Sequence, residues 1–63
     1  MTLTEAIKDV DKHKGRRTFV FRTLDMAEQH ANCWRNQLAQ QNMKKAFGIT
    51  KRGNTITVER WSR

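Results

Sequence analysis

Apolar residues near the start of the chain recur at the spacing of one helical face. The repeating positions are Leu3, Ala6, Ile7 and Val10, which follow the i, i+3, i+4, i+7 pattern of an amphipathic helix. Thr2 and Glu5 stand three residues apart, the spacing of a capping box that satisfies amide groups in the first turn. The sequence therefore predicts a short helix over residues 3–12, followed by a loop.

The pattern then changes to that of a strand and of a longer helix. Residues 17–23 contain a β-branched and aromatic run, and alternation places Phe19 and Phe21 on one face of a strand. A second helical stripe follows, formed by Ala27, Ala31, Trp34 and Leu38. Thr23 or Asp25 can cap the start of this helix, and its end is expected near residue 42.

The last third of the chain predicts a β-hairpin. Apolar residues alternate with small or polar ones over residues 46–50 and 55–59, and a glycine in the intervening residues can supply the positive φ of a tight turn. We expect the register that sets Phe47 opposite Val58, because it makes one face entirely apolar. A register shifted by two would set Phe47 opposite Arg60.

Together these elements predict one small α+β domain over residues 1–63, in the order α-β-α-β-β. The last strand is richest in β-branched residues, so we place it in the middle of a three-stranded antiparallel sheet ordered 1-3-2. The apolar face of this sheet would pack on the long helix. The opposite face would be smooth and rich in threonine. The first helix either covers this second face with Leu3, Ile7 and Val10 or leaves it exposed.

Charge indicates the class of partner. The chain has 63 residues, with 13 Lys and Arg against 6 Asp and Glu, which gives a net charge of +7. Two stretches, residues 12–23 and 35–58, contain basic residues and no acids. Because such blocks create a strong positive field, the expected partner is a polyanion.

The candidate binding residues lie in these two stretches or close to their ends. They are Lys14, Arg16, Arg17, Arg22, Lys44, Lys51, Arg52 and Trp61. The cations can neutralise phosphates, and Trp61 is either covered by the first helix or free to stack on a base. Within these stretches, the basic segment of residues 12–17 could equally be a solvated loop, and the basic segment of residues 51–54 a solvated turn. They would converge if the loop before the first strand lay beside the hairpin.

The remaining chemistry-bearing residues indicate neither an enzyme nor a metal or cofactor site. His30 and Cys33 stand three apart on the long predicted helix, but no further spacing of Cys and His completes a metal site. The acids do not form the cluster of a metal-dependent nuclease, and the apolar runs are too short to span a membrane. With a single cysteine and no export signal, we expect a cytoplasmic protein.

Two functions of different classes stay open. The first is a small non-catalytic nucleic-acid-binding protein that contacts the phosphates of DNA or RNA through its basic surface. The alternative is a small inhibitor or adaptor, of the kind encoded by phages and plasmids, which docks that surface on an acidic site of a larger host protein. A homodimer would fit either function, because exposed edges of a three-stranded sheet can pair with a second copy.

Overall fold

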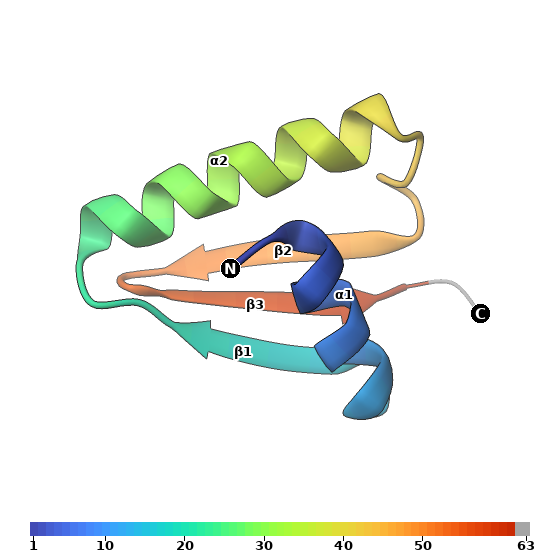
Figure 1. The fold of residues 1–63 in the computed structure, drawn as a ribbon, viewed down its shortest axis with the longest axis horizontal. Helices are drawn as coiled ribbons and strands as arrows, with labels where there is room; N and C mark the ends of the chain where they lie inside the picture. The colour runs from blue at the N-terminus through green and yellow to red at the C-terminus, as the bar shows by residue number, and fades with distance from the viewer. Residues whose placement is uncertain (62–63) are drawn as a thin grey trace.

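The computed structural model describes residues 1–61 and has the predicted α+β architecture (Figure 1). Its elements are α1 (Leu3–Lys12), β1 (Arg16–Val20), α2 (Leu24–Gln40), β2 (Phe47–Arg52) and β3 (Thr55–Arg60). The strands form one antiparallel sheet in the order β1-β3-β2. The predicted sheet order and the central place of the last strand are confirmed. The first strand is shorter than expected, because it ends at Val20 and not at residue 23.

Both helices begin at threonine caps: Thr2 is the predicted cap of α1, and Thr23 is one of the two caps proposed for the long helix. The Thr2 hydroxyl accepts a hydrogen bond from the Glu5 amide at 3.2 Å, and the Glu5 carboxylate accepts one from the Thr2 amide at 2.9 Å. This second bond favours the ionised carboxylate, so the pKa of Glu5 lies below its ordinary value of 4.5. At α2 the Thr23 hydroxyl accepts a hydrogen bond from the Met26 amide at 3.1 Å.

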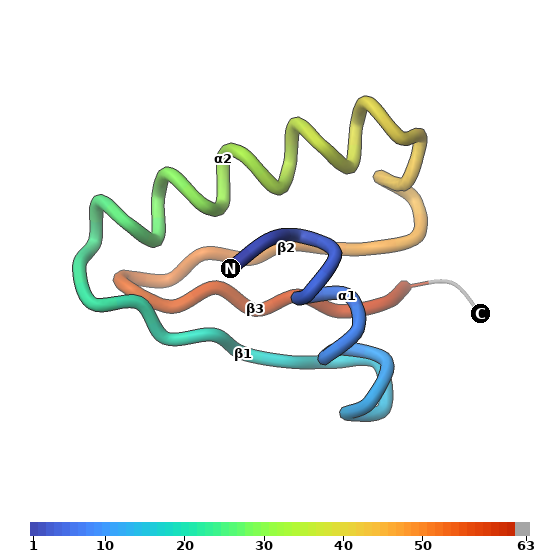
Figure 2. The backbone as a smooth tube through the Cα atoms, in the orientation of Figure 1, coloured from blue at the N-terminus to red at the C-terminus, as the bar shows by residue number. Residues whose placement is uncertain are grey.

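Both helices lie on the same face of the sheet. In Figure 2 the α2 trace runs above the strands, and α1 crosses in front of β3 and β1. One buried cluster joins all five elements: Leu3, Ala6, Val10, Phe19, Ala27, Ala31, Trp34, Leu38, Phe47, Ile56 and Val58. Helix α2 packs on β2 and β3, whereas α1 packs on β3 and β1. Since one helix covers only part of the apolar face, the stripe of α1 fills the remainder and leaves the threonine-rich face exposed.

The hairpin register differs from the expected one. Phe47 lies opposite Arg60, so the predicted pairing of Phe47 with Val58 is wrong by two residues. The turn explains the difference, because this register leaves only Gly53 and Asn54 in the loop. Gly53 has a φ of 56°, which suits a two-residue turn that begins with glycine. Arg60 is also well placed, since its guanidinium lies over the Phe47 ring at 4.5 Å from the centroid.

The two outer strands of the sheet are edges within the part of the chain that the structure describes. β1 and β2 each pair with β3 on one side only. Each edge also carries two adjacent cations, Arg16 and Arg17 on β1 and Lys51 and Arg52 on β2. Within these residues neither edge is paired with a further strand, and pairing with a second copy stays a prediction.

Candidate nucleic-acid interface

The sheet surface opposite the two helices, here called the open face, carries small and polar side chains. By alternation along the strands it consists of Arg16, Thr18, Val20, Gly48, Thr50, Arg52, Thr55, Thr57 and Glu59. The Val20 side chain is 75% exposed, which shows that no element covers this surface at β1. The register places Thr18, Thr57 and Thr50 in one row across the three strands, and the Thr18 and Thr57 hydroxyls are 3.0 Å apart.

Two arginines stand at diagonal corners of the open face. Arg16 begins the edge strand β1, and Arg52 ends the other edge strand, β2. Glu59, which pairs with Arg16 in the register, is the one acid on this face among the described residues. In residues 1–61 the ion pair that forms is that of Asp11 with Arg60, at 2.8 Å and on the helix side. The guanidinium groups of Arg16 and Arg52 are therefore available to an anionic ligand.

A shallow depression connects these corners across the middle of the face. Its volume is about 300 Å³, and it is bounded by the two arginines together with Thr50, Thr57 and Glu59. The hydroxyl groups at its centre can donate to phosphate or sugar oxygens, and the arginines can hold phosphates at its margins. The open face thus has the polarity of a surface for an anionic chain.

The hairpin turn and the link between β1 and α2 form one end of the sheet, here called the turn end. The Phe21 amide donates to the Asn54 carbonyl, and the Asn54 side-chain amide donates to the Phe21 carbonyl, both at 2.8 Å. This double contact holds the link, and with it Arg22, next to the turn. Arg22 from the first basic stretch therefore lies close to the hairpin cations of the second stretch.

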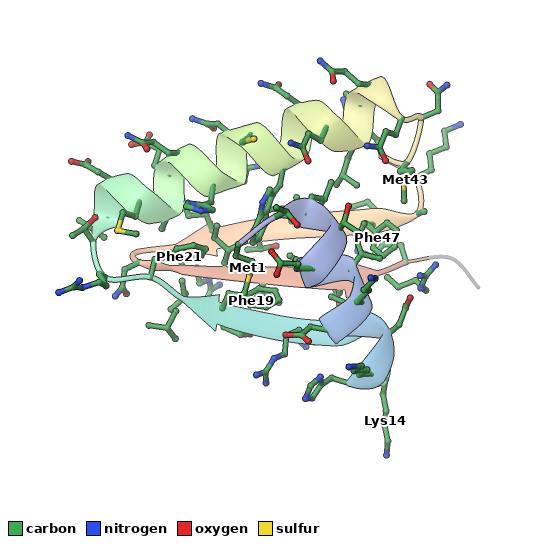
Figure 3. All side chains as sticks on the ribbon, viewed as in Figure 1. Met1, Lys14, Phe19, Phe21, Met43 and Phe47 are labelled. Carbon is green, nitrogen blue, oxygen red and sulfur yellow. The ribbon has the colours of Figure 1, made fainter. Side chains whose placement is uncertain are left out.

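The opposite end of the sheet, here called the loop end, is where β1 and β2 begin and β3 finishes. Lys14 lies two residues before the start of β1, and its side chain points away from the domain (Figure 3). Lys44 lies in the loop before β2. The loop before β1 is thus at the far end from the hairpin turn, so the condition under which these two segments would converge is not met. Each basic stretch instead contributes cations to both ends.

Two of the predicted cations lie on the helix side of the sheet. Arg17 alternates with the open-face residues and shares the face of Phe19, and Lys51 similarly shares the face of Ile49. Lys51 is half-buried opposite Ile56, whereas Arg17 is exposed. The structure therefore separates Arg17 and Lys51 from the open face and places them at opposite edges of the sheet.

Trp61 lies on the open face and is not covered by α1. Its amide donates to the Ala46 carbonyl at 2.7 Å, which continues the pairing of β2 with β3 beyond Arg60. A Cβ at position 48 would overlap the indole atoms Nε1, Cε2 and Cζ2, so Gly48 is the residue that gives the ring its place. The Trp61 side chain is nevertheless 64% exposed.

Arg35 is a cation that the sequence-based interpretation missed. It lines a second depression together with Lys44 and Trp61, at the β2 edge of the sheet. The available signal was its spacing, since it stands three residues before Leu38 and so borders the buried stripe of α2.

The pair on α2 that raised the question of metal or thiol chemistry has structural contacts. A ring nitrogen of His30 lies 2.8 Å from the Met26 carbonyl, and its ring packs at 4.6 Å from the ring of Phe21. The Cys33 sulfur accepts a hydrogen bond from the Gln37 side-chain amide at 3.4 Å. Within residues 1–61 no group of three or more His, Cys, Asp or Glu side chains could hold a metal ion.

No family model matches the chain, and neither a curated protein nor a solved structure matches it. In the part of the chain that the structure describes, neither helix has the length and apolar character needed to cross a membrane.

Proposed function

We propose that this protein is a small non-catalytic nucleic-acid-binding domain whose open face lies against a sugar–phosphate backbone. The observation that carries the proposal is the uncovered sheet face, which has threonines at its centre and Arg16 and Arg52 at its corners. Both helices pack on the other side, so the backbone would meet no steric obstacle from them. Sheets and β-ribbons are established geometries for contact with nucleic acid.

The dimensions and charges of the sheet support the same conclusion. A six-residue strand such as β3 extends over about 20 Å, at roughly 3.3 Å per residue. Since one strand of a duplex carries a phosphate about every 3.4 Å of helix axis, this length matches roughly six base-pair steps. Arg22 at the turn end and Lys14 and Lys44 at the loop end would extend the contact beyond the face itself.

The state of the single cysteine indicates a compartment. Cys33 is an exposed free thiol, which is the state expected in a reducing compartment. We place the proposed activity in the cytoplasm on this ground.

The test is a fluorescence-anisotropy titration of labelled DNA and RNA, single-stranded and duplex, over a series of salt concentrations. About five phosphate contacts predict a slope of log K against log salt near −3.5 for single strands and −4.5 for duplex. In the double variant Arg16→Gln/Arg52→Gln the loss of two contacts should make the slope shallower by about 1.4 to 1.8.

A matched control distinguishes a defined interface from general charge attraction. The double variant Lys8→Gln/Lys12→Gln lowers the net charge equally but changes α1, on the helix side. It should retain nearly all binding. Equal losses in both double variants, or no binding of wild-type protein to any nucleic acid at low salt, would contradict the proposal. A nuclease-resistant, stoichiometric acidic protein partner would favour the inhibitor instead.

A further inference from the structure

The two tryptophans of the chain differ sharply in exposure to solvent. Trp34 is 2% exposed and belongs to the core, whereas Trp61 is 64% exposed. Even so, its backbone is tied to Ala46 at 2.7 Å, and its ring occupies the space above Gly48 that a side chain would otherwise fill. An aromatic ring is therefore presented to solvent from a backbone that the sheet holds in place.

A depression of about 260 Å³ lies beside this indole. Leu38, Phe47 and Ile49 give it an apolar floor, and Arg35 and Lys44 supply cations on its rim. Among residues 1–61, no carboxylate lines it. Its volume is just below the range of about 300–1,000 Å³ that is usual for drug-sized ligands, and so suits one flat ring system.

An aromatic platform, an apolar floor and two adjacent cations together match the parts of one nucleotide. A base offers a flat π-surface that stacks on an indole, and its phosphate requires a cation. On the other side of Gly48 lies Glu59, which repels phosphate. At this nucleotide the bound backbone would therefore turn toward the β2 edge, where Lys44 and Arg35 lie.

We infer, building on the function proposed above, that Trp61 is a stacking platform for one unpaired base and that Lys44 and Arg35 hold the adjacent phosphate. The protein accordingly selects single-stranded nucleic acid over duplex. In a duplex both faces of each base are covered by its neighbours, and extrusion of a base costs a few kcal/mol. A single strand offers its bases to the indole at a much lower cost.

The experiment compares a mixed-sequence single-stranded 12-mer with its duplex, with tryptophan emission and anisotropy as readouts. Because Trp34 is buried, quenching by the oligonucleotide and protection from acrylamide should come from Trp61. Trp61→Ala should weaken single-strand binding about 5- to 150-fold and leave duplex binding almost unchanged. Trp61→Phe, which keeps an aromatic ring, should retain most of the affinity.

A second variant leaves the indole intact and changes only its position. Gly48→Ala displaces the ring, so it should weaken single-strand binding as Trp61→Ala does, with circular dichroism confirming the fold. Tighter binding to the duplex, or full single-strand affinity in Trp61→Ala while Arg16→Gln/Arg52→Gln loses binding, would overturn the inference and leave the proposed function standing. Failure of the wild type to bind either oligonucleotide would overturn both.

Discussion

The contact between Asp11 and Arg60 holds α1 to the helix side of the sheet, and its strength can be tested by a double-mutant cycle. The Arg60 Nε and a terminal nitrogen both donate to the Asp11 carboxylate, at 2.8–3.0 Å. The same guanidinium lies over the Phe47 ring at 4.5 Å. One side chain thus joins α1, β3 and the start of β2.

The magnitude follows from the exposure of the pair. The side chains of Arg60 and Asp11 are 35% and 51% exposed, so screening by solvent limits the ion pair to about 0.5–1 kcal/mol. The cation–π contact with Phe47 adds about 0.5–1 kcal/mol. Arg60→Ala, which removes both, should therefore lower the free energy of unfolding by about 1–2 kcal/mol. For a domain of this size that corresponds to roughly 4–16 °C in Tm.

Asp11→Ala alone is a poor test, because removal of the Asp11 carboxylate changes the free energy of unfolding in two opposed ways. Asp11 lies in the last turn of α1, where a negative charge is unfavourable by about 0.3–1 kcal/mol against the helix dipole. Removal of this charge offsets part of the lost ion pair. The interaction free energy from Asp11→Ala, Arg60→Ala and the double variant isolates the pair, and we expect about 0.5–1 kcal/mol.

The assay is urea denaturation followed by far-UV circular dichroism, at low salt and again near 1 M salt. The interaction free energy should fall in high salt, because the pair is partly exposed and is screened. A value near zero at low salt would refute the reasoning that the pair joins α1 to β3. A value that salt does not change would refute its ionic origin.

Two further predictions concern the core and the first helix cap. Trp34 contacts the rings of Phe19 and Phe21 edge-on, with centroids 5.8 and 6.1 Å away, so Trp34→Ala should cost about 3–5 kcal/mol, comparable with the stability expected of so small a domain. The Trp34→Ala variant should lack a cooperative thermal transition by circular dichroism, and a cooperative transition would contradict the packing argument. The second prediction concerns Glu5, whose pKa in the folded state is lowered. The Glu5 carboxylate therefore stabilises the fold above pH 4.5, and this stabilisation is lost as the pH falls through the lower pKa of the folded state. Glu5→Gln should reduce the dependence of the free energy of unfolding on pH, measured by urea unfolding between about pH 6 and pH 3. A variant whose stability falls with acid as much as that of the wild type would contradict the role of Glu5.

Much of the fold was predictable because its determinants are local. Both helices are specified by residues adjacent in the sequence: the regular spacing of their apolar stripes and their threonine caps. For α1 the cap is completed by Glu5, three residues after Thr2. The register of the hairpin was predicted wrongly, although one of its determinants, the two-residue turn of Gly53 and Asn54, is also local. An apolar partner for Phe47 is the best choice when only two strands are considered, whereas Arg60 becomes the better partner once Asp11, 49 residues away, holds its guanidinium.

The candidate site was predictable in composition but not in arrangement. Alternation along the strands correctly separates a threonine-rich face from an apolar one, yet it does not say which face α1 covers. That depends on how much of the apolar face α2 leaves free, a property of the assembled layers. The separation of Lys14 from Lys51 could have been derived, because the order 1-3-2 with antiparallel neighbours requires β1 and β2 to begin at the same end.

The cations on the two edge strands have a consequence for self-association. Addition of a second sheet at β1 would bring Arg16 and Arg17 toward the like charges of another molecule, and addition at β2 would do the same with Lys51 and Arg52. Electrostatic repulsion therefore disfavours edge-to-edge growth when the protein is alone in dilute buffer. A polyanion that neutralises these groups removes the repulsion. Under the function proposed above, neighbouring copies on one long polyanion would then pair along these edges and bind cooperatively.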